Sequence, residues 1–135
     1  MNRDKLKEFF SKCELNLPVE KPVVDEFQED AGTELPDAYA EFLQFSNGAE
    51  GALGNGSYVQ MWKAEELTEL NESYRVKEFA PGMLLIGSGG GDEAIGIDLR
   101  KGSQTYGSFY KIPFIPLDWD KAILLGPEIT DIKII

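Results

Sequence analysis

The fold of this chain is decided by the stretch Leu35-Pro36-Asp37-Ala38-Tyr39-Ala40-Glu41-Phe42-Leu43-Gln44-Phe45-Ser46-Asn47-Gly48. Pro36 suits the first position of a helix, where its missing N–H and preset φ cost nothing, and Asp37 then places negative charge in the positive first turn. Asn47-Gly48 closes the segment, because both residues tolerate the left-handed conformation of a helix C-terminus. The apolar side chains recur at the spacing of one helix face: Leu35, Tyr39, Phe42 and Leu43. The stretch predicts a docked helix with a tight exit.

Length and composition favour one domain spanning residues 1–135. The chain is 42% hydrophobic and 11% aromatic, which is typical of a folded core rather than of disorder. No apolar run approaches the roughly 20 residues that span a bilayer, and the charged first residues lack the apolar core of a signal peptide. The single cysteine, Cys13, has no internal disulfide partner, as is usual in a reducing compartment. We therefore expect a cytoplasmic protein.

Net charge and histidine content restrict the chemistry. The chain contains no histidine, which excludes Ser-His-Asp and Cys-His arrangements and most zinc sites. The net charge of −11 argues against nucleic acid as a direct partner and against an anionic membrane surface, because both require basic protein surface.

The acidic residues are concentrated in one segment. Between Glu14 and Glu50 there are ten acidic residues and one basic residue, Lys21, a local net charge of −9 over 37 residues. Most such segments are solvated surface. An acidic field also attracts a basic protein and accelerates the encounter with it. Both interpretations stay open from charge alone.

Three helices are predicted in the first third of the chain. A stripe of Leu6, Phe9, Phe10 and Cys13 indicates a helix over residues 3–13, in which Cys13 is a buried thiol rather than a nucleophile. The segment 15–18 breaks this helix, because proline disfavours helix in the residue before it. A second helix over residues 22–30 begins at a proline and stops at Ala31-Gly32. The third is the stretch quoted above.

Beyond residue 50 the pattern changes to strands. We predict one further helix over residues 64–74 and strands at 53–62 with a turn at 54–56, 83–86, 94–99, 105–112, 123–125 and 129–135. Helices segregated from a mostly antiparallel meander define an α+β fold. We expect a twisted, mostly antiparallel sheet with the N-terminal helices and one inserted helix packed on it.

Two patterns suggest a ligand site, and both have simpler explanations. The glycine-rich segment 86–93 carries Asp92-Glu93 where a phosphate loop needs its lysine, so we interpret it as an inter-strand turn. Asp98, beside another turn, is expected to accept backbone hydrogen bonds. Five carboxylates lack the spacing of a calcium loop, and no pair is marked as the acid and base of a glycosidase: Asp92, Glu93, Asp98, Asp118 and Asp120. We predict no metal site, no cofactor and no catalytic residue.

Aromatic residues of the strand region are candidates for an exposed partner anchor: Trp62, Trp119, Tyr58, Tyr106, Phe109 and Tyr110. Core packing is the commoner fate of such side chains. We place Trp62 in the core, and Trp119, between two aspartates, near the surface.

Three landmarks occur in a fixed order along the chain. The first runs from Leu35-Pro36 to Asn47-Gly48, and the second is Trp62 leading into a helix with Asn71 and Tyr74. The third is the glycine-rich segment 84–92 followed by the strand that ends at Asp98. Together they resemble the SUKH superfamily, named in part for Smi/Knr-type regulators of yeast cell-wall synthesis, over roughly residues 20–125.

The resemblance implies an α+β fold and a role in protein binding. Bacterial members resemble immunity proteins of polymorphic toxin systems, which neutralise a cognate toxin domain, often a nuclease, and fungal relatives are associated with cell-wall assembly signalling. The family pattern contains no catalytic residue. Many members end in a helix where this chain has Pro127 and an isoleucine-rich tail. The matching positions are expected to be fold determinants: Leu35, Pro36, Tyr39, Leu43, Asn47, Gly48, Gly90, Gly91 and Asp98.

We therefore expect a non-catalytic immunity protein that neutralises a basic toxin domain by occluding its surface. The alternatives are a regulatory scaffold related to cell-wall signalling and a carboxylate-based hydrolase or metal-binding protein. The expected contact surface is an acidic face: Glu29, Asp30, Glu34, Asp37, Glu41, Glu50, Asp92, Glu93 and Trp119.

Overall fold

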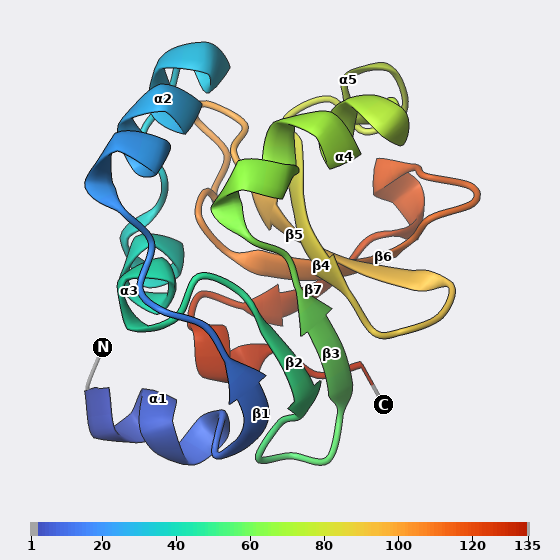
Figure 1. Cartoon of the computed structure of the whole chain (residues 1–135). Helices are drawn as coiled ribbons and strands as arrows, with labels where there is room; N and C mark the ends of the chain where they lie inside the picture. The colour runs from blue at the N-terminus through green and yellow to red at the C-terminus, as the bar shows by residue number, and fades with distance from the viewer. Residues whose placement is uncertain (1–2, 135) are drawn as a thin grey trace.

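Seven strands form one antiparallel sheet in the computed structural model, which describes residues 3–134 (Figure 1). Each strand pairs with its neighbour along the chain, so the sheet is a meander with β1 and β7 at its edges. The bounds are β1 Lys12–Leu15, β2 Ala49–Ala52, β3 Tyr58–Met61, β4 Met83–Ser88, β5 Glu93–Asp98, β6 Phe109–Pro113 and β7 Ile123–Gly126. Together with the helices this confirms the predicted α+β fold.

The helices lie around the sheet in two groups. Figure 1 shows α1, α2 and α3 on one side of the molecule, whereas α4 and α5 lie together beside β4. Within residues 3–134, no helix combines the length and apolar character needed to cross a membrane. The α-helices are α1 Arg3–Phe9, α2 Lys21–Ala31, α3 Asp37–Phe45, α4 Leu67–Ser73 and α5 Val76–Phe79, and the 3-10 helices are η1 Ala64–Glu66, η2 Trp119–Lys121 and η3 Ile129–Asp131.

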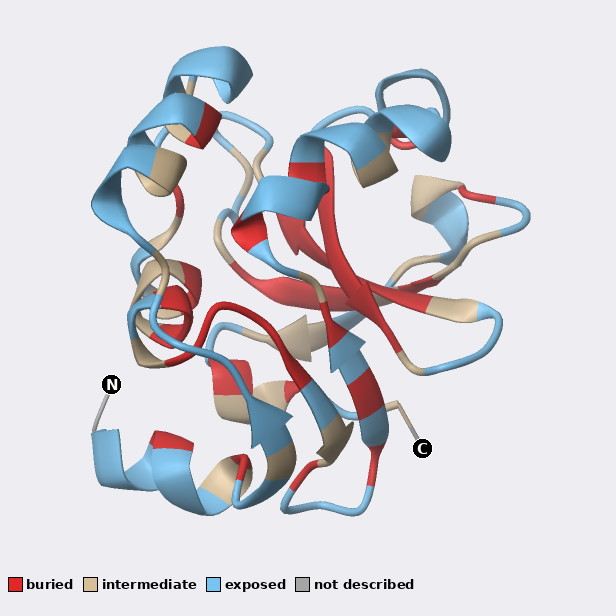
Figure 2. Cartoon of the chain, in the orientation of Figure 1, coloured by how far each residue is buried: buried red, intermediate tan, exposed pale blue. Residues whose placement is uncertain are grey.

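The central strands β4 and β5 are buried on both faces (Figure 2). Leu84 and Ile86 point into the larger core, which α1 and α3 cover. Met83 and Leu85 point into a smaller core on the opposite face, together with Val76 of α5. Because alternate side chains of a strand face opposite sides, a strand covered on both faces is apolar throughout. This explains the short apolar run 83–86 and confirms the strand predicted there.

The helix predicted from the opening stretch is present as α3, with different ends. Pro36 is the residue before the helix rather than its first helical residue. At the other end Ser46 has an extended conformation, so Asn47-Gly48 does not form the left-handed cap that we expected. The apolar stripe is confirmed, because Tyr39, Phe42 and Leu43 are fully buried. The helices predicted at 22–30 and 64–74 are also confirmed, the first as α2 and the second as η1 followed by α4.

The helix predicted over residues 3–13 is wrong in its second half. The helix ends at Phe9, and residues 12–15 form the edge strand β1, in which Cys13 lies opposite Gly51 of β2. The sequence pattern could not reveal this strand, because its hydrogen bonds depend on a partner almost forty residues away. Cys13 is half-buried, its thiol donates to the Ala52 carbonyl oxygen at 3.3 Å, and burial raises the pKa of the thiol.

The strand predicted over residues 129–135 is also wrong; its last residue lies outside the described part of the chain. Residues 129–131 form the short helix η3, and Ile129 and Ile132 are fully buried in the larger core. Residues three positions apart lie on one face of a 3-10 turn. The alternation of isoleucines with polar residues suggested the two-residue period of a strand, but the buried isoleucines follow the three-residue period of a 3-10 turn.

Candidate functional site

Asn47 links the segment after α3 to the start of η1. Its side-chain oxygen accepts the Ala64 N–H at 2.8 Å, and its side-chain nitrogen donates to the Glu65 carboxylate at 2.6 Å. The second bond lowers the pKa of Glu65. The next residue, Gly48, has φ +86°, and a Cβ there would lie 2.7 Å from the Met61 carbonyl oxygen. Asn47-Gly48 therefore caps η1 and lets β3 approach closely, which is a structural role.

Asn71 supplies strand-like hydrogen bonds to β4. Its amide accepts the Leu85 N–H at 2.8 Å and donates to the Leu85 carbonyl at 2.9 Å and to the Leu67 carbonyl at 2.8 Å. β3 pairs with β4 only at Ser88 and Gly87, so Leu85 has no ladder partner on that side. Asn71 thus replaces the missing strand and fixes α4 on the sheet.

Asp98 is the centre of a buried polar network at the end of β5. Its carboxylate is 0% exposed and accepts two hydrogen bonds from the Arg100 guanidinium at 3.0 and 3.1 Å and one from the Arg100 N–H at 2.9 Å. The hydroxyls of Ser103 and Thr105 donate to it at 2.6 and 2.7 Å. Burial alone would raise the pKa of this carboxyl, but these hydrogen bonds outweigh burial and lower it. Asp98 accepts a backbone hydrogen bond in the turn, as predicted, and it also accepts hydrogen bonds from three side chains.

The Asp98 network positions two aromatic side chains of the surface. The Arg100 guanidinium lies 3.6 Å from the centre of the Trp119 ring, whose N–H donates to the Pro81 carbonyl at 2.7 Å. One face of Trp119 is therefore covered by the chain itself. Tyr106 follows directly on Thr105, so the network also holds the turn from which the exposed Tyr106 ring projects.

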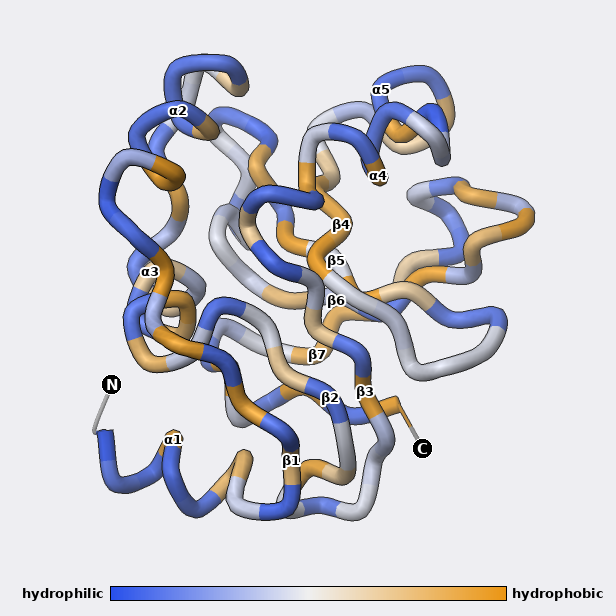
Figure 3. Tube along the Cα trace, viewed as in Figure 1, coloured by the Kyte–Doolittle hydropathy of each residue, from blue (hydrophilic) through white to orange (hydrophobic). Residues whose placement is uncertain are grey.

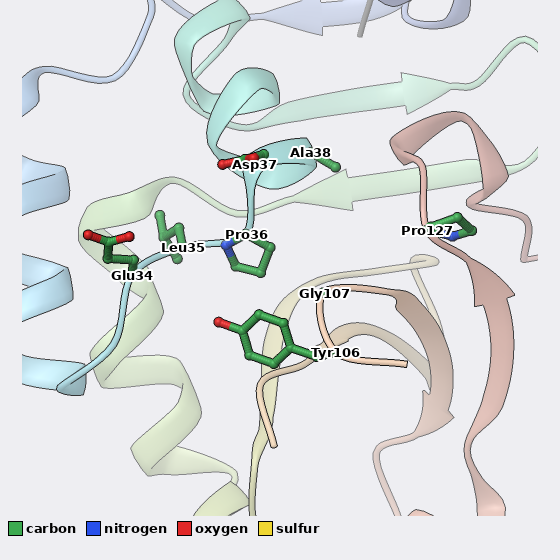
Figure 4. A pocket seen from close by; sticks show the side chains of 8 residues that line it. All are labelled: Glu34, Leu35, Pro36, Asp37, Ala38, Tyr106, Gly107 and Pro127. Carbon is green, nitrogen blue, oxygen red and sulfur yellow. The ribbon is translucent and has the colours of Figure 1, made fainter. Parts of the chain in front are cut away.

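A hollow of about 360 Å³ lies between the α2–α3 link and this turn (Figure 4). Figure 4 shows the Tyr106 ring opposite Pro36, with its hydroxyl end turned toward the side where Glu34 lies. Asp37 stands on the same short segment at the start of α3. The hollow is thus lined by one aromatic ring and by two exposed acidic residues, Glu34 and Asp37, which suits a lysine or arginine side chain. Its main lining residues are Glu34, Leu35, Pro36, Asp37, Tyr106 and Pro127.

Two of the predicted contact residues, Glu34 and Asp37, line this hollow, and two more precede them closely along the chain. Glu29 and Asp30 lie in the last turn of α2, Glu34 in the link, and Asp37 at the start of α3. All four are exposed, and within residues 3–134 none of them forms an ion pair. We call these four residues the α2–α3 acidic surface.

The other predicted contact residues lie elsewhere. Glu41 is half-buried on α3, and Glu50 on β2 accepts the Tyr58 hydroxyl at 3.0 Å. Asp92 and Glu93 lie at the β4–β5 turn, on the opposite side of the molecule from α2 in Figure 1. The structure therefore divides the nine residues among several surfaces instead of one acidic face.

A second hollow, of about 480 Å³, lies beside that turn. Trp62 and Tyr74 are nearly parallel there, with interplanar angle 4° and centroids 6.3 Å apart, and Phe114 lies 4.6 Å from Tyr74. Trp62 was predicted to lie in the core. It packs against both cores but is only half-buried. We call this hollow the aromatic groove; it is lined chiefly by Trp62, Leu70, Tyr74, Asp92, Phe114 and Ile115.

The glycine pair of the third landmark lies at the rim of the aromatic groove. Gly90 has φ +84°, and a Cβ there would come within 2.9 Å of the Tyr58 ring. Gly91 has open space around it. Gly90 is thus required by the turn, whereas Gly91 leaves backbone uncovered at the groove.

The carboxylates considered for a cation site do not converge. The oxygens of Asp98 are occupied by Arg100, Ser103 and Thr105. Asp118 accepts the Asp120 N–H at 2.9 Å and caps η2. In the part of the chain that the structure describes, no cluster of three or more His, Cys, Asp or Glu residues has the arrangement to hold a metal ion.

Sequence reasoning missed the residues that complete the aromatic groove. Tyr74, Phe114 and Ile115 were not among the candidate anchors, and Ile115 is 90% exposed. One local signal was available: Phe114-Ile115 stands between Pro113 and Pro116, which keep two large apolar residues in a loop.

The landmarks described above also identify the family. A comparison with curated proteins finds no match. The family model for the SMI1/KNR4 family (SUKH-1) matches residues 18–132, from just before α2 to the residue after η3. Since this match covers most of the chain, the chain belongs to the SMI1/KNR4 family (SUKH-1).

Proposed function

We propose that the chain is a non-catalytic protein-binding domain that acts as an immunity protein. It binds a basic toxin domain and blocks the toxin's substrate-binding surface. The observation that carries this proposal is the α2–α3 acidic surface. Its carboxylates are exposed and form no ion pair within residues 3–134, and two of them, Glu34 and Asp37, line a hollow with an exposed tyrosine. Membership of the SMI1/KNR4 family is compatible with protein binding.

The mechanism is electrostatic steering followed by occlusion. The net charge of −11 attracts a basic domain from a distance, and the acidic surface orients it. A lysine or arginine of the toxin enters the hollow lined by Glu34, Asp37 and Tyr106 and stacks on the tyrosine ring. Neutralisation then needs no chemical step by this chain, because a nuclease whose basic cleft is covered cannot reach its substrate.

The test uses the toxin-like domain encoded beside the gene for this chain. Association is measured at low and high salt for the natural chain and for a variant with four substitutions, Glu29→Gln, Asp30→Asn, Glu34→Gln and Asp37→Asn. We expect association to slow by about tenfold or more in the variant and to lose most of its salt dependence. A matched control neutralises four exposed acids elsewhere: Glu8, Glu69, Glu72 and Asp120.

The control separates local contact from overall charge. Both variants change the net charge by the same amount, so equal slowing would assign the effect to net charge and contradict the acidic surface. If the neighbouring gene encodes no toxin domain and the chain protects cells against none, the immunity role fails, and the regulatory-scaffold alternative takes its place.

A further inference from the structure

We propose that the aromatic groove binds an extended segment of a partner protein in which a lysine or arginine stands two positions from a large apolar residue. This goes beyond the proposed function, because the groove lies at the β4–β5 turn and does not include the α2–α3 acidic surface. Its lining residues come mainly from α4, the β4–β5 turn and the loop between β6 and η2, which are drawn in Figure 1.

The apolar part of the groove is an uncovered surface of large side chains. Ile115, in the loop after β6, is 90% exposed and lies next to the stacked Trp62, Tyr74 and Phe114. The hydropathy colouring of Figure 3 shows apolar chain at the tip of this loop. Single exposed apolar residues are ordinary, but an exposed isoleucine beside three aromatic rings forms a continuous patch of the kind that marks interaction sites. A large apolar side chain of a partner would cover it.

The charged part of the groove selects the second feature of the partner. Asp92 is exposed at the groove, and within residues 3–134 neither Asp92 nor its neighbour Glu93 forms an ion pair. A cationic side chain that reaches Asp92 also lies near the faces of the aromatic rings, so two attractions act on it together. An acidic residue at the same place would meet the Asp92 carboxylate and a chain of net charge −11.

The shape of the groove favours an extended backbone. Gly91 has open space where a Cβ would stand, so a partner's main chain can approach the backbone of the turn. Gln60 of β3 lines the same side and carries both a hydrogen-bond donor and an acceptor. An extended segment presents alternate side chains to one face, which matches an aromatic floor with a carboxylate at one end.

The experiment is an NMR titration of the isotope-labelled full chain with three blocked pentapeptides. The probe is acetyl-Leu-Gly-Arg-Gly-Leu-amide, in which the leucines and the arginine share one face of an extended chain, and two controls replace either its arginine by glutamate or both its leucines by serine. We expect the probe to shift the Trp62 indole N–H and the Gly90 and Gly91 amides, with a dissociation constant in the millimolar range. Each control peptide should bind about fivefold more weakly or not at all.

Variants then locate the site. Ile115→Ser and Asp92→Asn change exposed side chains, so neither is expected to unfold the chain. Each should raise the dissociation constant of the probe peptide by about fivefold. Ile123→Ser and Asp120→Asn make the same changes at exposed positions that do not line the groove, and should leave binding unchanged. The proposal is overturned by absence of binding up to about 5 mM probe, by equal binding of the three peptides, or by equal effects of groove and control variants.

Discussion

The two ends of β5 carry aspartates with opposite environments. Asp98 at the C-terminal end is fully buried, and five donors from Arg100, Ser103 and Thr105 surround its carboxylate. Asp92, just before the N-terminal end, is exposed, and within the described residues it has no ion pair. The same residue type therefore organises the fold at one end and remains available to a partner at the other.

The difference teaches where negative charge in this chain has a structural use. A buried carboxylate is costly unless hydrogen bonds compensate it, so the Asp98 network must be complete. An exposed carboxylate stays hydrated and contributes little to stability, but it acts at a distance on a charged partner. Of the 24 acidic residues, Asp98 is therefore expected to matter most for folding and Asp92 for binding.

The largest effect is expected when the two aspartates are replaced in parallel. Asp98→Asn keeps the size of the side chain but turns an amide donor toward groups that are themselves donors. We expect a loss of about 3 kcal/mol in the free energy of unfolding, against less than about 0.5 kcal/mol for Asp92→Asn. Urea unfolding of both variants measures this. Equal losses would show that burial does not distinguish the two aspartates.

A second test asks whether hydrogen bonding rather than charge makes the difference. Asn71→Ala leaves the Leu85 N–H and carbonyl without their partner, and we expect it to cost about 2 kcal/mol. Glu72→Ala on the same helix alters an exposed side chain and should change little. Urea unfolding again provides the measurement, and hydrogen exchange at Leu85 should quicken only in the Asn71 variant. Unchanged exchange at Leu85 would contradict the assigned role.

The lowered pKa of Asp98 predicts a pH dependence with a definite sign. The unfolded chain, with an aspartate pKa near 3.9, binds a proton more readily than the folded chain, so stability rises with pH in this range. The contribution of Asp98 is complete above pH of about 5 and decreases as pH falls toward the folded pKa, by about 1 kcal/mol at pH 3. Unfolding measured between pH 7 and 3 should show this decrease in the natural chain relative to Asp98→Asn. Parallel curves would exclude it.

The smallest effect concerns Tyr39, whose buried hydroxyl lacks, among the described residues, the hydrogen-bond partners that surround Asp98. The Tyr39 hydroxyl is fully buried and, within residues 3–134, has no hydrogen-bond partner. Burial raises the pKa of Tyr39 above its ordinary value. Tyr39→Phe removes the unsatisfied hydroxyl, and we expect a gain of about 1 kcal/mol, or a melting temperature higher by a few degrees. A loss of stability would indicate that the hydroxyl does have a partner.

The local sequence pattern was sufficient to predict elements whose own apolar side chains mark their buried faces. The stripe of α3 and the apolar run of β4 were predicted because periodicity reports which faces are apolar. It failed for β1 and η3: β1 exists only through pairing with β2, and Ile129 and Ile132 are positioned by the core that they enter. The role of Asn47 was missed for the same reason, since its partners lie 17 and 18 residues further along the chain.

The candidate sites show the same division. Acidity between residues 14 and 50 was visible in the sequence, and two of its members, Glu34 and Asp37, do line one hollow because they are close along the chain. Asp92 and Glu93 were assigned to the same face on charge alone, and the meander carries them to the other side of the molecule. Charge reports composition but not position.

By itself the sequence determined the amphipathic stripe of α3, the apolar strand β4, a net charge of −11 and the three landmarks of the family. Only the tertiary structure decided which side chains share a surface. The aromatic groove joins Trp62, Tyr74 and Asp92 with the loop at Phe114-Ile115, which are separated by up to some fifty residues. Apolar periodicity specifies that a face must be covered, whereas strand register and loop course decide what covers it and what remains exposed.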